Sequence, residues 1–230
     1  MNNEFWVMVG WLIAASLLGF GISAVFAGWL RLPRRRFLVP YVIIASLYLY
    51  SFVTLNEIDF VSMLTRNWVW GTLAGTLVSI FLVKTVRAQP LSRQSSGMDL
   101  FVDIGWAGLV YGLVDALFLN VIPVVAVWLG ASSFGWPATP VAKFAVGAAG
   151  LFASLLVTLA YHLGYPEFRN RKVGMVLAGN SVITLAFLLS GGPLGSIISH
   201  TVMHIAAVLQ GAETTIQLPP HYRTPAIRAH

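Results

Sequence analysis

The feature that most constrains this chain is a series of long apolar segments separated by short polar loops. An α-helix needs about 20 such residues to cross a hydrocarbon core of about 30 Å. Only 10% of the residues are charged, against about 25% in soluble domains. The sequence therefore predicts an all-α polytopic bundle of transmembrane helices. The apolar segments are Phe5–Leu30, Phe37–Leu55, Trp68–Val86, Leu100–Leu129, Pro140–Leu163, Val173–Leu189 and Leu194–Gln210.

The fourth segment is the least regular. Thirty helical residues would be about 45 Å long, which exceeds the thickness of the hydrocarbon core. Asp99 and Asp103 indicate that its first turns lie at the membrane surface, and Pro123 is a candidate kink. We therefore expect seven spans, with an eighth short helix within residues 100–133 as the alternative.

The basic residues predict the orientation. If the N-terminus is outside, the inner loops and tail hold all of the 14 basic residues except Arg66 and Lys143. Such a bias is typical of cytoplasmic loops, and seven spans then place the C-terminus inside. We expect a three-span region with basic inner loops at residues 1–99, a helical core at 100–211 and a polar cytoplasmic tail at 212–230.

Composition excludes several classes of function. The chain has no cysteine, which rules out disulfides and thiolate chemistry. The net charge of +6 lies in short clusters at helix ends, so no nucleic-acid partner is expected. The expected partners are the lipid bilayer and other membrane subunits. The small size and short loops favour a bacterial inner (plasma) membrane.

Four ionisable residues inside the apolar segments are the candidate site. They are Asp115, His162, His200 and His204. Ionisable groups in a membrane are costly and usually face a protein interior or a water-filled cavity. Asp115 has no basic residue one helical turn away, so we expect a partner from another helix, with the histidines as the best candidates.

His200 and His204 are spaced i, i+4 and share a helix face. Two neutral imidazoles in this arrangement can bind a metal ion or polarise a water molecule. Imidazole is also an axial ligand of haem and of chlorophyll-type pigments. The cofactor is therefore left open, and two helix-packing histidines are the structural alternative.

Other polar and small residues predict close helix packing. Gly108 and Gly112 form a GxxxG pair one turn before Asp115, a spacing that lets helices approach closely. Asn120 on the fourth segment, and Asn180, Ser181 and Thr184 on the sixth, are interpreted mainly as interhelical hydrogen-bonding groups.

Three stretches, taken in order, resemble the motifs of a known membrane family. They are Val114–Leu119, Thr158–Gly164 and Gly195–His204. Their order and spacing resemble those of the CPBP family, which comprises CAAX prenyl proteases and bacteriocin-processing (Abi) membrane proteins. The resemblance covers about residues 108–211.

The departures from the family pattern are specific. Val114 and Asp115 stand where the family has two glutamates, and Leu119 replaces the motif's arginine. Thr158 stands at the position of an aromatic residue, and His204 at that of an asparagine. In the family, a glutamate activates water for hydrolysis inside the membrane while histidines and the asparagine orient water and stabilise the oxyanion.

Loss of the diglutamate favours a non-proteolytic role, as a subunit, assembly factor or ligand-binding factor of a membrane complex. The alternative is a variant intramembrane protease that uses Asp115 with His162, His200 and His204. A third reading is a transporter with these groups as a proton relay, although no inverted repeat is visible. Convergence of Asp115, His162 and His200 on one water would favour hydrolysis.

Overall fold

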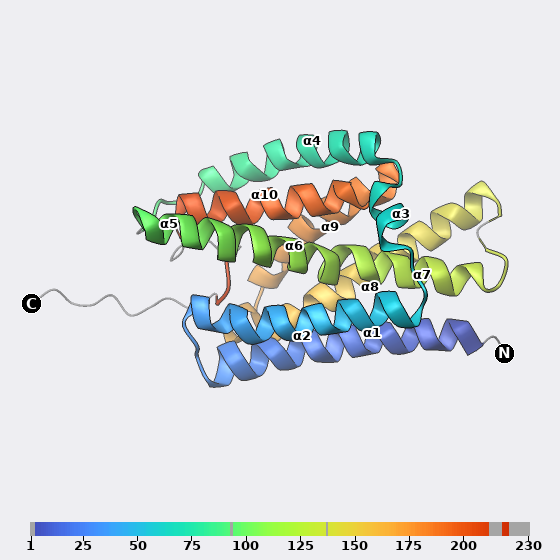
Figure 1. The fold of residues 1–230 in the computed structure, drawn as a ribbon, viewed down its shortest axis with the longest axis horizontal. Helices are drawn as coiled ribbons and strands as arrows, with labels where there is room; N and C mark the ends of the chain where they lie inside the picture. The colour runs from blue at the N-terminus through green and yellow to red at the C-terminus, as the bar shows by residue number, and fades with distance from the viewer. Residues whose placement is uncertain (1–2, 93, 137, 212–217, 221–230) are drawn as a thin grey trace, which may run out of the picture.

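The computed structural model describes residues 3–92, 94–136, 138–211 and 218–220, and this part of the chain contains helices and no strand (Figure 1). Six of its helices are long and apolar enough to cross a membrane. A further apolar helix, α10, has 17 residues. Outside the middle of the chain, the helices are α1 (Asn3–Ile22) with its π-helical extension η1 (Ser23–Trp29), α2 (Arg34–Leu55), α3 (Phe60–Thr65), α4 (Trp68–Arg87), α8 (Pro140–Leu163), the 3₁₀ turn η4 (Pro166–Phe168), α9 (Lys172–Ser190) and α10 (Leu194–Gln210).

The middle of the chain forms one continuous helical run of 35 residues, Met98–Ser132, here called the central helix. Of its most apolar window, 72% is buried, far more than in the other spans. It is one helix and not two, so the alternative of a short eighth helix in this segment is wrong. The run consists of α5 (Met98–Asp103), η2 (Ile104–Val110), α6 (Tyr111–Asp115), η3 (Ala116–Val121) and α7 (Ile122–Ser132).

Pro123 does not interrupt the central helix, although proline has no N–H to donate to the carbonyl four residues earlier. That carbonyl belongs to Leu119, and it accepts a hydrogen bond of 2.7 Å from the Ser154 hydroxyl of α8. The neighbouring helix therefore supplies a donor to a carbonyl one turn before Pro123, a compensation that is usual near proline in membrane helices.

The other helices surround the central helix. Figure 1 shows α1 and α2 side by side along one flank, and α4 with α10 along the opposite flank. α10 packs against α4, α9 and the η2 and α6 parts of the central helix, and α8 packs against α1, α7 and α9. The helix that carries His200 and His204 therefore lies directly beside the helix that carries Asp115.

The predicted GxxxG contact is confirmed, and its partner is α10. A Cβ atom on Gly108 would lie 3.0 Å from the Ile205 side chain, and one on Gly112 would lie 2.9 Å from the Cα atom of Thr201. Neither position has room for a side chain unless α10 moves. This close approach brings the two imidazole side chains of α10 within reach of the short Asp115 side chain.

Loops that the charge bias assigned to the same side of the membrane lie at the same end of the bundle. Arg35, at the start of α2, forms ion pairs of 2.9 Å with Asp99 and 2.7 Å with Asp103 at the start of the central helix. The Gln210 side chain, at the end of α10, donates to the carbonyl of Gln89 after α4 at 2.6 Å. Of the predicted tail, only 218–220 are described, so His221 and His230 lie outside the described residues.

The opposite end carries α3, a six-residue helix that the sequence did not predict. Asp59 caps it, because its carboxylate accepts hydrogen bonds from the hydroxyl and the backbone N–H of Ser62. These hydrogen bonds lower the pKa of Asp59. At the same end, the Asn67 side chain donates to the carbonyl of Ser190, the last residue of α9.

Candidate functional site

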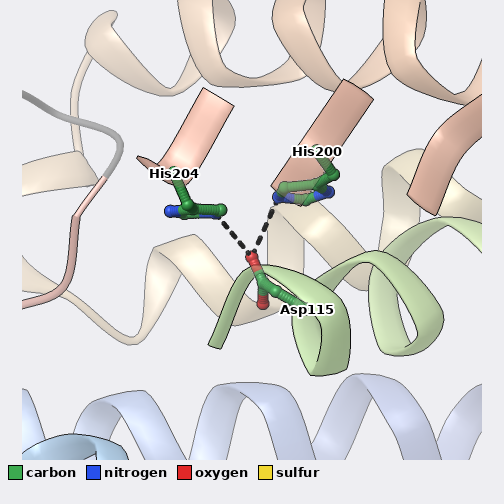
Figure 2. Close-up of side chains that lie close together, drawn as sticks. All are labelled: Asp115, His200 and His204. Atoms are coloured by element: carbon green, nitrogen blue, oxygen red, sulfur yellow. Dashed lines mark ion pairs between the residues drawn. The ribbon is translucent and has the colours of Figure 1, made fainter. Parts of the chain in front are cut away.

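Asp115 is a buried carboxylate whose two oxygens face different helices (Figure 2). Its Oδ2 atom lies 3.1 Å from Nε2 of His200 and 3.6 Å from Nε2 of His204, both on α10. Its Oδ1 atom accepts a hydrogen bond from the Tyr41 hydroxyl of α2. Three helices therefore meet at one carboxylate, and we call Asp115, His200 and His204 the Asp115 cluster.

Local helix geometry positions the cluster. His200 and His204 stack with ring centroids 5.0 Å apart and planes 12° from parallel, as their i, i+4 spacing allows. Asp115 is the last residue of α6 and is followed by the π-helical segment η3. π-Helical turns of this kind occur frequently at functional sites.

His204 is 2% exposed, and neither of its ring nitrogens has a hydrogen-bond partner among the described residues. The ring packs against that of Tyr111 in an edge-to-face arrangement, with centroids 4.6 Å apart. A buried donor or acceptor without a partner costs about 1–3 kcal/mol. His204 therefore has unused binding capacity beside Asp115.

The orientation of His200 follows from a hydrogen-bond chain that begins at the Leu119 carbonyl. A carbonyl only accepts, so Ser154 uses its one hydroxyl hydrogen there. The Asn180 side chain, 3.1 Å from the Ser154 oxygen, must then donate through its NH₂ group. This leaves the Asn180 carbonyl oxygen facing the NH₂ group of Asn120 at 2.7 Å.

The same chain fixes the tautomer of His200. Since Asn120 donates to Asn180 and to Thr184, its own carbonyl oxygen faces Nδ1 of His200 at 2.7 Å. Nδ1 therefore carries a hydrogen and donates it to Asn120. In a neutral ring the lone pair is then on Nε2, the nitrogen that faces Asp115.

His162 lies on α8 and is 8% exposed. Its Nδ1 lies 2.8 Å from the carbonyl of Thr158 in its own helix, so Nδ1 donates and a neutral ring has its lone pair on Nε2. His162 is therefore buried inside the protein.

All four predicted site residues line one cavity of about 540 Å³. Asp115, His162, His200 and His204 contribute to its wall together with Thr158, whose hydroxyl has no hydrogen-bond partner among the described residues. The rest of the wall comes mainly from apolar residues of α4 and α9. Polar groups, of which Thr158 and His204 have unused hydrogen-bonding capacity among the described residues, therefore face an otherwise apolar space.

The cavity reaches the lateral surface of the bundle between α4 and α9. Phe81 of α4 and Met175 of α9 are among its lining residues and are 54% and 59% exposed. In a membrane-spanning bundle this surface faces lipid.

Four buried tyrosines form a second polar group beside the cluster. The Tyr165 hydroxyl donates to that of Tyr161 at 2.7 Å, and the hydroxyls of Tyr161 and Tyr111 are 3.1 Å apart. The Tyr41 ring packs against that of Tyr161, with centroids 5.4 Å apart, and its hydroxyl donates to Asp115. Buried phenols require such partners.

Sequence reasoning missed Tyr41 and Ser154. Tyrosine and serine are common in membrane helices, and nothing in the local sequence of either residue points to Asp115 or to Leu119. The one available signal was Pro123, which implies that the Leu119 carbonyl needs a donor from another helix.

Comparison with family models, with curated proteins and with solved structures found no match to this chain.

The hydrogen-bond chain predicts that Ser154→Ala destabilises the protein by about 1–3 kcal/mol, because it leaves the Leu119 carbonyl and the Asn180 amide without this partner. Ser199→Ala is the matched control, since this buried hydroxyl donates to Gly195 within its own helix. The free energy of unfolding, measured by detergent titration, should fall for Ser154→Ala and change little for Ser199→Ala. Equal effects would contradict the assigned chain.

Proposed function

We propose that this protein is an intramembrane hydrolase in which the Asp115 cluster activates water. The observation that supports this most strongly is the convergence of Asp115, His162, His200 and His204 on one cavity. A carboxylate buried among membrane helices indicates function by default, because it is costly to keep there. The resemblance to the CPBP family implies a hydrolytic site at the same residues. Membership of that family stays a prediction.

The proposed chemistry follows from the contacts of each residue. Asp115 accepts the proton of a water in the cavity as general base. His200 is held by Asn120 and Tyr41 holds the other Asp115 oxygen, so the base has a defined orientation. His204, whose ring nitrogens have no hydrogen-bond partner among the described residues, is the group that would polarise the substrate and stabilise the developing oxyanion. The Nε2 lone pair of a neutral His162 would accept a hydrogen bond from the attacking water and help to orient it.

The position of the cavity favours a substrate with an apolar part. Its opening between α4 and α9 is lined by exposed apolar side chains such as Phe81 and Met175. A lipid-linked or membrane-embedded substrate could enter from the bilayer through this opening and place its polar bond beside Asp115.

A non-proteolytic, ligand-binding role in a membrane complex is the second candidate. The observation that favours it is the replacement of the motif's glutamates and arginine by Val114, Asp115 and Leu119. Without the second carboxylate, the site retains groups that bind a ligand and has fewer that transfer protons.

The hydrolase proposal predicts that Asp115→Asn lowers hydrolysis by at least about 10²-fold, since loss of a general base has effects of this size. The probe is an internally quenched, prenylated peptide in lipid–detergent micelles. Asp103→Asn is the control, because Asp103 lies on the same helix and pairs with Arg35 at the bundle end. Full activity of Asp115→Asn would refute the proposed base. Absence of cleavage by the wild-type protein would favour the second candidate.

We also propose seven spans with the N-terminus outside and the C-terminus inside, in a bacterial plasma membrane. In this proposal α10 is the seventh span. It has 17 residues, and it packs between α4 and the central helix as the other spans pack against their neighbours. The charge bias supports the orientation.

Because the chain has no cysteine, the orientation can be measured with single cysteines. Ala138→Cys, between α7 and α8, should react with a membrane-impermeant maleimide added to intact cells. Ser96→Cys, before the central helix, should react only after the membrane is permeabilised. The reverse pattern would invert the proposed orientation.

A further inference from the structure

The contact between His200 and Asp115 joins two acceptors. The hydrogen-bond chain places the hydrogen of a neutral His200 on Nδ1, so Nε2 presents a lone pair. The Asp115 carboxylate oxygen lies 3.1 Å from that lone pair. Two acceptors at this distance repel each other unless a proton or another cation lies between them.

A single proton would satisfy only part of the site. It can join Asp115 to His200, but His204, whose Nε2 lies 3.6 Å from the same carboxylate oxygen, would still lack a hydrogen bond. Among the described residues, no lysine or arginine forms an ion pair with Asp115. The cluster therefore offers three ligand atoms around a position that favours positive charge.

We propose that the Asp115 cluster binds one divalent first-row metal ion of the Zn²⁺ class. The three ligand atoms lie within 4.8 Å of one another. Metal–ligand bonds of about 2.0–2.1 Å separate the ligands of a tetrahedral ion by about 3.3 Å. The distances from Asp115 Oδ2 to the two imidazole nitrogens, 3.1 and 3.6 Å, bracket that value.

The hydrogen bonds of His200 and Asp115 fit those of metal ligands. A ligating histidine usually donates its other N–H to a neighbouring acceptor, and His200 donates Nδ1–H to Asn120. Tyr41 occupies the second oxygen of Asp115, which leaves Oδ2 as a single ligand atom. His204, held by no such bond, can turn to complete the set.

The ligand types select among metals. Two imidazoles and one carboxylate suit zinc and its first-row neighbours, whereas magnesium and calcium prefer oxygen ligands. Three protein ligands leave a fourth position for water or substrate, which is the pattern of catalytic zinc sites. The cavity beside the cluster, lined also by His162, provides the space for that ligand.

This inference concerns the same site as the proposed hydrolase and is tested without substrate. With an ion bound, Asp115 would be a ligand, and hydrolysis would use the ion-bound water. A metal-free protein that hydrolyses the probe would overturn the metal site and leave the hydrolase. A protein that binds metal but does not hydrolyse the probe would support the metal site and overturn the proposed hydrolase.

The experiment measures metal content in the full chain. The purified protein is stripped with a chelator, incubated with ZnCl₂ or with Fe²⁺ under argon, desalted and analysed by mass spectrometry. We expect about one zinc per chain in the wild type and loss of at least nine-tenths of it in His204→Ala and Asp115→Asn. His162→Ala, which removes a cavity histidine outside the cluster, should retain the zinc. Preferential retention of iron would reassign the ion to Fe²⁺ and overturn the zinc assignment.

A second measurement separates ligand loss from misfolding. Zn²⁺ should raise the thermal unfolding midpoint of the wild type and of His162→Ala, and should leave that of His204→Ala unchanged. Co²⁺ loading should give the wild type the visible absorption of a tetrahedral site. A metal-free wild type, or a His204→Ala variant that keeps its zinc and its stabilisation, would overturn the proposal.

Discussion

The structure depends on the side chains that stabilise the buried carboxylate of Asp115. Asp115 lies inside a helix bundle that has lipid as its solvent, where an isolated charge is costly. Tyr41 from α2 and His200 and His204 from α10 supply its neighbours. The same contacts tie together α2, the central helix and α10. The chemistry of the site and the packing of the bundle are thus parts of one arrangement.

A second set of contacts links that carboxylate to the shape of the central helix. One turn before Pro123, Ser154 donates to the Leu119 carbonyl, and two asparagines carry the direction of hydrogen bonding on to His200. This chain of hydrogen bonds therefore determines which imidazole nitrogen of His200 faces Asp115. This lone pair beside a carboxylate is the origin of the proposed affinity for a cation.

The sequence predicted the helices to within about one turn at their ends, because each apolar run has polar boundaries. It also identified Asp115, His162, His200 and His204, since ionisable residues are conspicuous in apolar segments. Tyr41 and Ser154 could not be predicted, because a neutral hydroxyl in a helix gives no sign of its partner on another helix. Nor does the local sequence show that residues 98–132 form one uninterrupted helix.

The most direct measurement is X-ray absorption at the zinc edge on the zinc-loaded protein in a lipid bilayer. The proposed site predicts four nitrogen or oxygen ligands at about 2.0 Å and the outer-shell scattering of two imidazoles. In His204→Ala, part of this imidazole scattering should disappear. A shell of oxygen ligands without imidazole scattering would place the ion elsewhere. That result would contradict the assignment of Asp115, His200 and His204 as a metal-binding site.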